Sequence, residues 1–250
     1  MSGPVVNGLL LLAGVWAGAQ NALAGGGSFV TLGMLVLAGL DPRAANITST
    51  VALFPGQVAT GYAGVRFAAG AERLSFKALV LISLVGGIMG ALLLLVTPPV
   101  FFAGLVPWLV LFATTVFFWG SFIRRTSEHT LPFGPRGAAA AQLLIAIYGG
   151  YFGGGIGFLM LAVLTIAGLP VRNAAATKNV LAAAMNASAV AIFLFSRDVH
   201  WAQAAVLGTG GVAGGLVGSA LLSRVNERWL RIGVVLLGTA LAIGLFVRGT

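Results

Sequence analysis

Acidic residues and cysteine are what this sequence has least of. The chain of 250 residues contains five Asp and Glu residues and no cysteine, which excludes disulfides, iron–sulfur clusters and thiol catalysis. Only 8% of the residues are charged, against roughly 25% in an ordinary soluble domain, whereas 59% are hydrophobic. These figures exclude a water-soluble fold. No basic segment precedes the first apolar stretch, so we expect that stretch to remain in the membrane.

The few acidic residues all fall in or beside expected loops. Pumps and cation-coupled carriers usually hold their ion with a carboxylate inside the bundle, so a buried carboxylate relay is not expected. His129 and His200 also fall in loops, and no metal-ligand cluster or serine–base pair lies within an apolar segment. We therefore expect neither an enzyme nor a metal or other cofactor. The acidic residues are Asp41, Glu72, Glu128, Asp198 and Glu227.

The 14 lysines and arginines give a net charge of +9 and are concentrated in three loops. A nucleic-acid partner is not expected, because basic residues would then form a stripe on a polar surface. In membrane proteins such an excess marks cytoplasmic loops, and the uncharged loop Pro98–Gly104 is expected outside. Trp108, Trp119, Trp201 and Trp229 fall at expected segment ends, where they favour the membrane interface. The basic loop residues are Arg66, Arg73 and Lys77, then Arg124, Arg125 and Arg136, then Arg224, Arg228 and Arg231.

Ten apolar segments indicate an all-α polytopic membrane protein with about 8–10 membrane segments. Most have the ~20 residues needed to cross a bilayer. The second and seventh are shorter, and each follows a run of three glycines, Gly25–Gly27 or Gly153–Gly155. We expect these two to be half-helices that either cross the membrane or turn back. The segments are Val5–Ala24, Ser28–Leu40, Ala44–Gly64, Leu74–Thr97, Leu105–Ile123, Ala138–Phe152, Ile156–Leu169, Asn173–Phe195, Trp201–Leu222 and Trp229–Val247.

The two short segments belong to an internal repeat. A shift of 129 residues aligns Gly25–Val51 with Gly154–Val180 and makes 12 of 27 positions identical. We therefore divide the chain into a first repeat at 1–123, a cytoplasmic linker at 124–137 and a second repeat at 138–250. Each repeat holds five segments. This odd number, together with the loop charges, predicts two inverted repeats with both termini outside.

The glycine runs mark a candidate anion site. Glycines that end one helix and start another leave backbone N–H groups unpaired at the positive end of the new helix dipole. Transporters built from inverted repeats use such broken helices to bind anions near the middle of the membrane. The alternative is that these glycines only let helices pack closely, as we expect for glycines at four-residue spacing elsewhere, within the chain or between protomers. The candidate residues are Gly25, Gly26, Gly27, Ser28, Gly153, Gly154, Gly155 and Gly157.

A second group of candidates lies in the segments that follow the two half-helices. Lys178 stands about one turn into an apolar segment, where a charge is costly and marks a functional site by default. The alternative places Lys178 at the interface beside Arg172. Arg43 and Arg172 are interpreted as interfacial anchors. Gln57 and Asn186 come at matching repeat positions, and for these two the alternative is a polar bridge between helices. The group consists of Asn46, Thr48, Ser49 and Gln57 in the first repeat, and Thr177, Lys178, Asn179 and Asn186 in the second.

These residues resemble the motifs of the sulfite exporter TauE/SafE family of bacterial membrane proteins. The likeness rests on Ala24–Phe29, Ala45–Ala52 and Pro55-Gly56 in the first half, and on Gly153–Met160, Lys178–Leu181 and Asn186 in the second. The resemblance implies a permease that exports small sulfur-containing anions, with a site where the two glycine-led motifs meet.

The sequence thus predicts a secondary transporter in the bacterial cytoplasmic membrane. We expect it to export a small anion such as sulfite or a sulfonate by alternating access. Its expected partners are that anion and the lipid bilayer, and the glycine faces leave a homo-oligomer open. The alternatives are an anion channel and a membrane scaffold that transports nothing. A channel would conduct well above the turnover of a carrier, and a scaffold would bind no anion.

Overall fold

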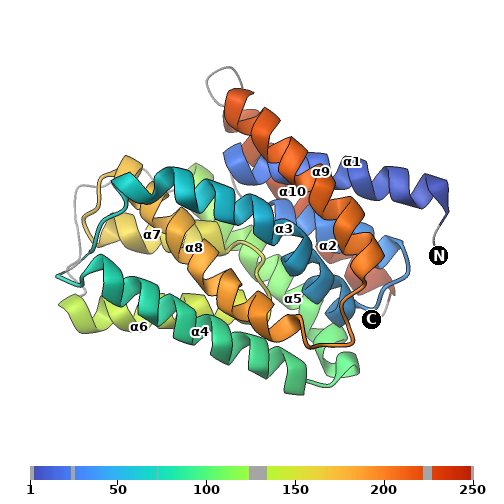
Figure 1. Cartoon of the computed structure of the whole chain (residues 1–250), viewed down its shortest axis with the longest axis horizontal. Coiled ribbons are helices and arrows are strands. Elements are labelled where there is room, and N and C mark those ends of the chain that lie inside the picture. The colour runs from blue at the N-terminus through green and yellow to red at the C-terminus, as the bar shows by residue number, and fades with distance from the viewer. Residues whose placement is uncertain (1–2, 24–25, 72, 124–133, 222–226, 249–250) are drawn as a thin grey trace.

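Ten α-helices make up almost the whole of the chain that the structure describes (Figure 1). The structure is a computed structural model, and it describes residues 3–23, 26–71, 73–123, 134–221 and 227–248. No named β-strand occurs in these ranges. The helices are α1 (Pro4–Leu23), α2 (Gly27–Leu37), α3 (Pro42–Gly64), α4 (Phe76–Val96), α5 (Pro99–Phe118), α6 (Gly134–Tyr151), α7 (Ile156–Ile166), α8 (Val171–Phe193), α9 (Trp201–Leu221) and α10 (Glu227–Arg248).

Helix boundaries agree with the apolar pattern because caps and prolines stand where the pattern breaks. The Asp41 carboxylate accepts hydrogen bonds from Arg43 N at 3.0 Å and Ala44 N at 3.1 Å, which caps the start of α3. The Ser75 hydroxyl caps α4 by accepting from Ala78 N at 3.2 Å. Each of the ten expected segments is confirmed as a helix.

The expectation for the segment after α4 is wrong. The sequence predicts a loop at Pro98–Gly104, but α5 begins at Pro99, so only Thr97 and Pro98 separate the two helices. Proline at the first position of a helix suits the fixed φ of its ring and leaves no required N–H unpaired, so it starts a helix here. Trp108 consequently lies in the middle of α5 and not at a segment end, and it packs edge-on against Phe246 at 5.1 Å between ring centroids.

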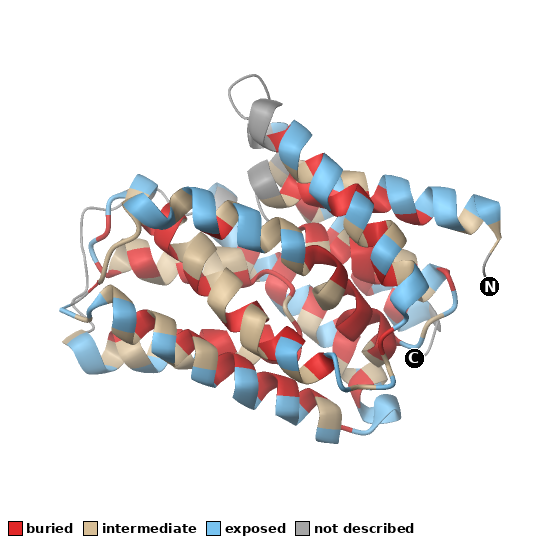
Figure 2. Cartoon of the chain, in the orientation of Figure 1, coloured by how far each residue is buried: buried red, intermediate tan, exposed pale blue. Residues whose placement is uncertain are grey.

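The helices place apolar side chains outside and polar ones inside. In Figure 2 the outward helix faces are largely exposed and the inward faces buried. Large apolar side chains such as Val100 and Tyr62 are exposed, whereas Thr31, Thr48 and Thr177 are fully buried. In the described parts of the chain three helices are long and apolar enough to cross a membrane: α4, α5 and Arg172–Phe193 of α8. This distribution suits a protein surrounded by lipid.

Two close helix pairs flank a central crossing. α1 packs on α9, α4 packs on α6, and α3 crosses α8 between them (Figure 1). Glycine allows the closest approaches: a Cβ at Gly14 would meet the backbone of α9, and one at Gly90 would meet that of α6. The expectation that glycines at four-residue spacing pack helices is therefore confirmed within the chain.

The helices α3 and α8 run in opposite directions. Near the start of α3, the Thr48 hydroxyl accepts a hydrogen bond from His200 N, which follows the end of α8, at 3.1 Å. Near the start of α8, Asn173 Nδ2 donates to Phe67 O, which follows the end of α3, at 3.0 Å. Each helix therefore begins where the other ends.

Candidate functional site

The two short helices begin after glycines with left-handed backbone. Gly26 precedes α2 with φ 81°, while Gly153 and Gly155 precede α7 with φ 76° and 75°. Residues with a Cβ rarely adopt this conformation, so glycine is required for the sharp change of direction. Neither helix has a side-chain cap from its N-cap residue. Gly25 lies outside the described residues.

The first turn of α7 leaves backbone donors unpaired. Among the described residues, no hydrogen bond is formed by the N–H groups of Ile156 and Gly157. The corresponding turn of α2 is capped by a side chain of α1, because Gly27 N donates to Asn21 Oδ1 at 2.8 Å. Unpaired N–H groups and the helix dipole make the start of α7 electropositive.

Lys178 brings a second positive charge to the start of α7. A Cβ placed on Gly157 would lie 3.6 Å from Lys178 Cδ and 3.7 Å from Nζ, so the side chain of Lys178 extends along this helix end. Within the described ranges Lys178 makes no ion pair or hydrogen bond. Two positive groups side by side without an acidic partner favour a bound anion.

A cavity of about 70 Å³ lies between these groups. A cavity needs about 10–15 Å³ for one water, so this one has room for a few waters or a small polyatomic ion. Both short helices contribute their first turn to it, and α3 and α8 form its sides. Its lining residues are Asn21, Gly26, Ser28, Gln57, Thr60, Gly153, Gly155, Ile156, Gly157, Lys178, Asn179 and Ala182.

Eight of the predicted site residues line this cavity: Gly26, Ser28, Gln57, Gly153, Gly155, Gly157, Lys178 and Asn179. Asn186 lies behind it, because its Nδ2 donates to Gln57 Oε1 at 2.5 Å and the residue is only 2% exposed. The two amides occupy positions 129 residues apart, which is the repeat spacing. The structure therefore brings residues from both halves of the chain together around one space.

The remaining predicted residues lie elsewhere. Gly27 packs against the backbone of Ala17, and Gly154 packs against the rings of Phe29 and Phe152. Asn46 Nδ2 donates to the backbone oxygen of Tyr151 at 3.0 Å.

Three hydroxyl residues among the predictions hold other parts of the chain together. The hydroxyls of Ser49 and Thr31 are hydrogen-bonded at 2.5 Å. Thr48 binds the loop after α8, donating to Asp198 O at 3.3 Å. Thr177 binds Ala69, accepting from its N at 2.9 Å and donating to its O at 3.3 Å. None of these three hydroxyl residues lines the cavity.

Sequence reasoning missed Asn21 and Thr60, which also line the cavity. Thr60 lies three residues after Gln57 and therefore on the same face of α3, so helical periodicity could have found it. Asn21 stands close before the first glycine run, and a polar residue so near a helix break was a usable signal. Its role as a cap for Gly27 requires the fold.

The sequence matches the family described as "Sulfite exporter TauE/SafE" over residues 10–245. The chain belongs to this family. It is 29% identical to the "Probable membrane transporter protein ORF9" of Sinorhizobium sp, over 96% of this chain and 92% of that protein. It is 27% identical to the "Probable membrane transporter protein YfcA" of Escherichia coli strain K12, over 97% of this chain and 90% of the relative.

A third relative, a "Probable membrane transporter protein" of Haemophilus influenzae, is 26% identical over 92% of this chain and 90% of its own length. No solved structure matches. The family and these names place the chain among membrane transporter proteins, which agrees with its apolar helices.

Proposed function

We propose that this protein is a secondary transporter that exports a small sulfur-containing anion, such as sulfite or a sulfonate, across the cytoplasmic membrane by alternating access. One observation carries the proposal. The ammonium of Lys178 lies beside Gly157 at the positive end of α7, and the cavity that both residues line has no acidic residue among its lining. An anion is the ligand that this arrangement favours.

The cavity supports a small oxyanion in particular. Its polar lining offers donors from four helices: Ser28 of α2, Gln57 of α3, the Gly157 N–H of α7, and Lys178 and Asn179 of α8. Sulfite and sulfonates carry three oxygens that can each accept a hydrogen bond. The family description names sulfite export, and this supports the same class of substrate.

Two inverted five-helix repeats account for the packing. The helix starts of α2 and α7, and likewise of α3 and α8, are separated by the repeat spacing of 129 residues. The pair α1–α9 corresponds to α6–α4, and α3–α9 corresponds to α8–α4, so each half packs on the other in the same way. Because the equivalent helices α3 and α8 are antiparallel, we infer that the halves have opposite orientations in the membrane.

Basic side chains at one end of the molecule support this orientation. Arg66, Arg73 and Lys77 are exposed where α3 ends and α4 begins, and Arg172 packs over the Phe67 ring at the same end. By the positive-inside rule this end is cytoplasmic. The start of α1 and the end of α10 lie toward the other end of the molecule (Figure 1), which agrees with termini outside. Lys178 comes seven residues into α8, or about 10 Å from its cytoplasmic end.

Export of an anion needs no second ion to drive it. A potential of ~100 mV, negative inside, favours outward movement of one negative charge by about 2.3 kcal/mol, or roughly fifty-fold in concentration. A dianion gains about twice that free energy. The absence of acidic residues from the cavity lining agrees with such a uniport.

The test is flux in proteoliposomes loaded with sulfite, a sulfonate or chloride, under an imposed potential. We expect saturable, potential-dependent efflux of sulfite or the sulfonate, which Lys178→Ala abolishes and Lys178→Arg largely retains. Undiminished flux in the folded alanine variant would remove Lys178 from the site. Flux that does not saturate, at rates far above carrier turnover, would indicate a channel. Absence of anion binding and flux in the wild type would refute transport of these anions.

A further inference from the structure

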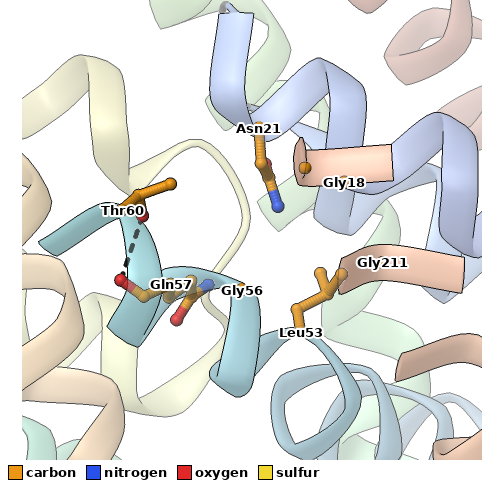
Figure 3. Close-up of a pocket in the computed structure, with 8 residues that line it drawn as sticks. Gly18, Asn21, Leu53, Gly56, Gln57, Thr60 and Gly211 are labelled. Atoms are coloured by element: carbon orange, nitrogen blue, oxygen red, sulfur yellow. Dashed lines mark hydrogen bonds between the residues drawn. The ribbon is translucent and has the colours of Figure 1, made fainter. Parts of the chain in front are cut away.

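A second cavity adjoins the anion cavity, between α1, α3 and α9 (Figure 3). Asn21, Gln57 and Thr60 line both cavities, so these three residues form the boundary between them. The second cavity has a volume of about 30 Å³, enough for about two waters. In Figure 3 the side chains of Asn21 and Leu53 point toward this space from two helices.

Three glycines in the wall of this cavity are not required for helix packing. A Cβ at Gly56 or Gly215 would have its nearest neighbour at 3.9 Å, and one at Gly211 would lie 3.5 Å from Leu53, which are ordinary contacts. By contrast, a Cβ at Gly18 would collide with the backbone of α9. Glycine inside a helix is less stable than alanine, so something other than packing favours it at these three positions. Each missing side chain keeps the cavity open.

The second cavity extends away from the cytoplasmic end. A Cβ at Gly61 of α3 would lie 3.3 Å from Asn179 O, so α3 packs on α8 at this level, where Thr60 and Asn179 line the anion cavity. One turn closer to the start of α3 lies Gln57, whose Oε1 accepts a hydrogen bond from Asn186 Nδ2 of α8. Leu53 lies four residues further toward the start of α3, or about 6 Å. The two cavities thus follow α3 toward the end at which Arg43 pairs with Asp198.

We propose that the glycine-walled cavity, lined by Gly56, Gly211 and Gly215, is the next section of the substrate path, and that Gln57 separates it from the anion cavity. This inference rests on the proposed function. Asn186 holds Gln57 at the boundary through the Nδ2 to Oε1 bond, while Asn186 Oδ1 is buried without a partner among the described residues. The Gln57 side chain must move before an anion can pass.

If the second cavity is part of the path, substitutions in its wall should lower flux without weakening anion binding. We would purify Gly56→Ala, Gly211→Ala and Gly211→Leu, and measure both equilibrium binding of sulfite and its flux in proteoliposomes. Gly104→Ala is the matched control, because Gly104 is a helix glycine with open space around it that lines neither cavity. The alanine variants fit the fold and keep the test valid if the leucine variant is unstable.

We expect Gly211→Leu to lower maximal flux by about ten-fold or more and the alanine variants to lower it less, with the Kd for sulfite within about two-fold of wild type. The control should match wild type in both measurements. Wild-type flux in all three cavity variants would overturn the path, as would loss of binding in parallel with flux. If Lys178→Ala loses binding and flux while the glycine variants keep both, the proposed path is refuted and the proposed function stands. If the wild type neither binds nor transports the anions, the proposed function itself is refuted.

Discussion

Replacing Asp198 by asparagine should favour the outward-open state. Asp198 Oδ2 accepts from Arg43 Nη2 at 2.8 Å, with side chains 25% and 16% exposed. Arg43 also donates to Thr97 O at 2.9 Å, so one arginine joins the start of α3, the end of α4 and the loop before α9. If the protein works by alternating access, these contacts hold the outer end closed and must break when it opens.

The magnitude follows from the burial of the pair. Exposed pairs contribute about 0.2–1 kcal/mol, while removing one partner of a buried pair costs about 3–5 kcal/mol. The partial exposure of both side chains and the remaining bond to Thr97 place this pair at about 1.5 kcal/mol, between those limits. That free energy corresponds to about a ten-fold larger outward-open population.

Labelling of a single cysteine measures that population, because the chain has no cysteine of its own. Ser49 is 3% exposed and bonded to Thr31 in this structure, so Ser49→Cys reacts with an external, impermeant maleimide only after the outer end opens. Labelling should be about ten-fold faster when Asp198→Asn is added. Asp198→Glu should restore slow labelling, and Asp41→Asn removes an exposed carboxylate nearby as a control. Equal rates with and without Asp198→Asn would refute the role of this pair.

Three further changes test the site and the packing. Lys178→Met removes a positive charge from the site. At about 4 Å and an effective dielectric constant of about 20, that charge stabilises a bound monoanion by up to about 4 kcal/mol, so the Kd measured by titration calorimetry should rise by up to about a thousand-fold. An unchanged Kd would contradict a direct contact between Lys178 and the anion. Gly214→Ala places a methyl group on the backbone of Val15 and should lower the stability to thermal unfolding by about 1–3 kcal/mol, whereas an unchanged Tm would show that α1 and α9 tolerate separation. Thr177→Val removes both hydroxyl bonds to Ala69 and should cost about 1–3 kcal/mol of stability in denaturant without changing the Kd for the anion; a weaker Kd would bring Thr177 into the site.

Helix positions could be predicted from the sequence because local chemistry sets them. Asp41 caps the start of α3, and the glycine runs mark the breaks before α2 and α7. The prediction at Pro99 is wrong because a proline after an apolar run is typical of a loop and equally of a helix start. Apolar periodicity alone does not distinguish these two roles.

Which polar residues line the site was harder to predict from the sequence. Lys178 and the glycine runs stand out locally, because a charge or a triple glycine is rare in an apolar segment. Thr48 and Thr177 have the same local pattern, yet each binds a loop from the other half of the chain, 150 and 108 residues away. Only the packing of α3 against α8 decides which polar groups line the cavity and which bind backbone.

The exchange of partners between the halves has a consequence for biosynthesis. The first helix, α1, packs on α9, and the sixth, α6, packs back on α4. About 200 residues separate the start of α1 from that of α9, so at about 5–20 residues per second the ribosome takes roughly 10–40 s to supply the partner of α1. During that time the glycine face of α1 is open to lipid or to the helices of other proteins. The insertion machinery must keep this face of α1 free of other helices until almost the whole chain has been translated.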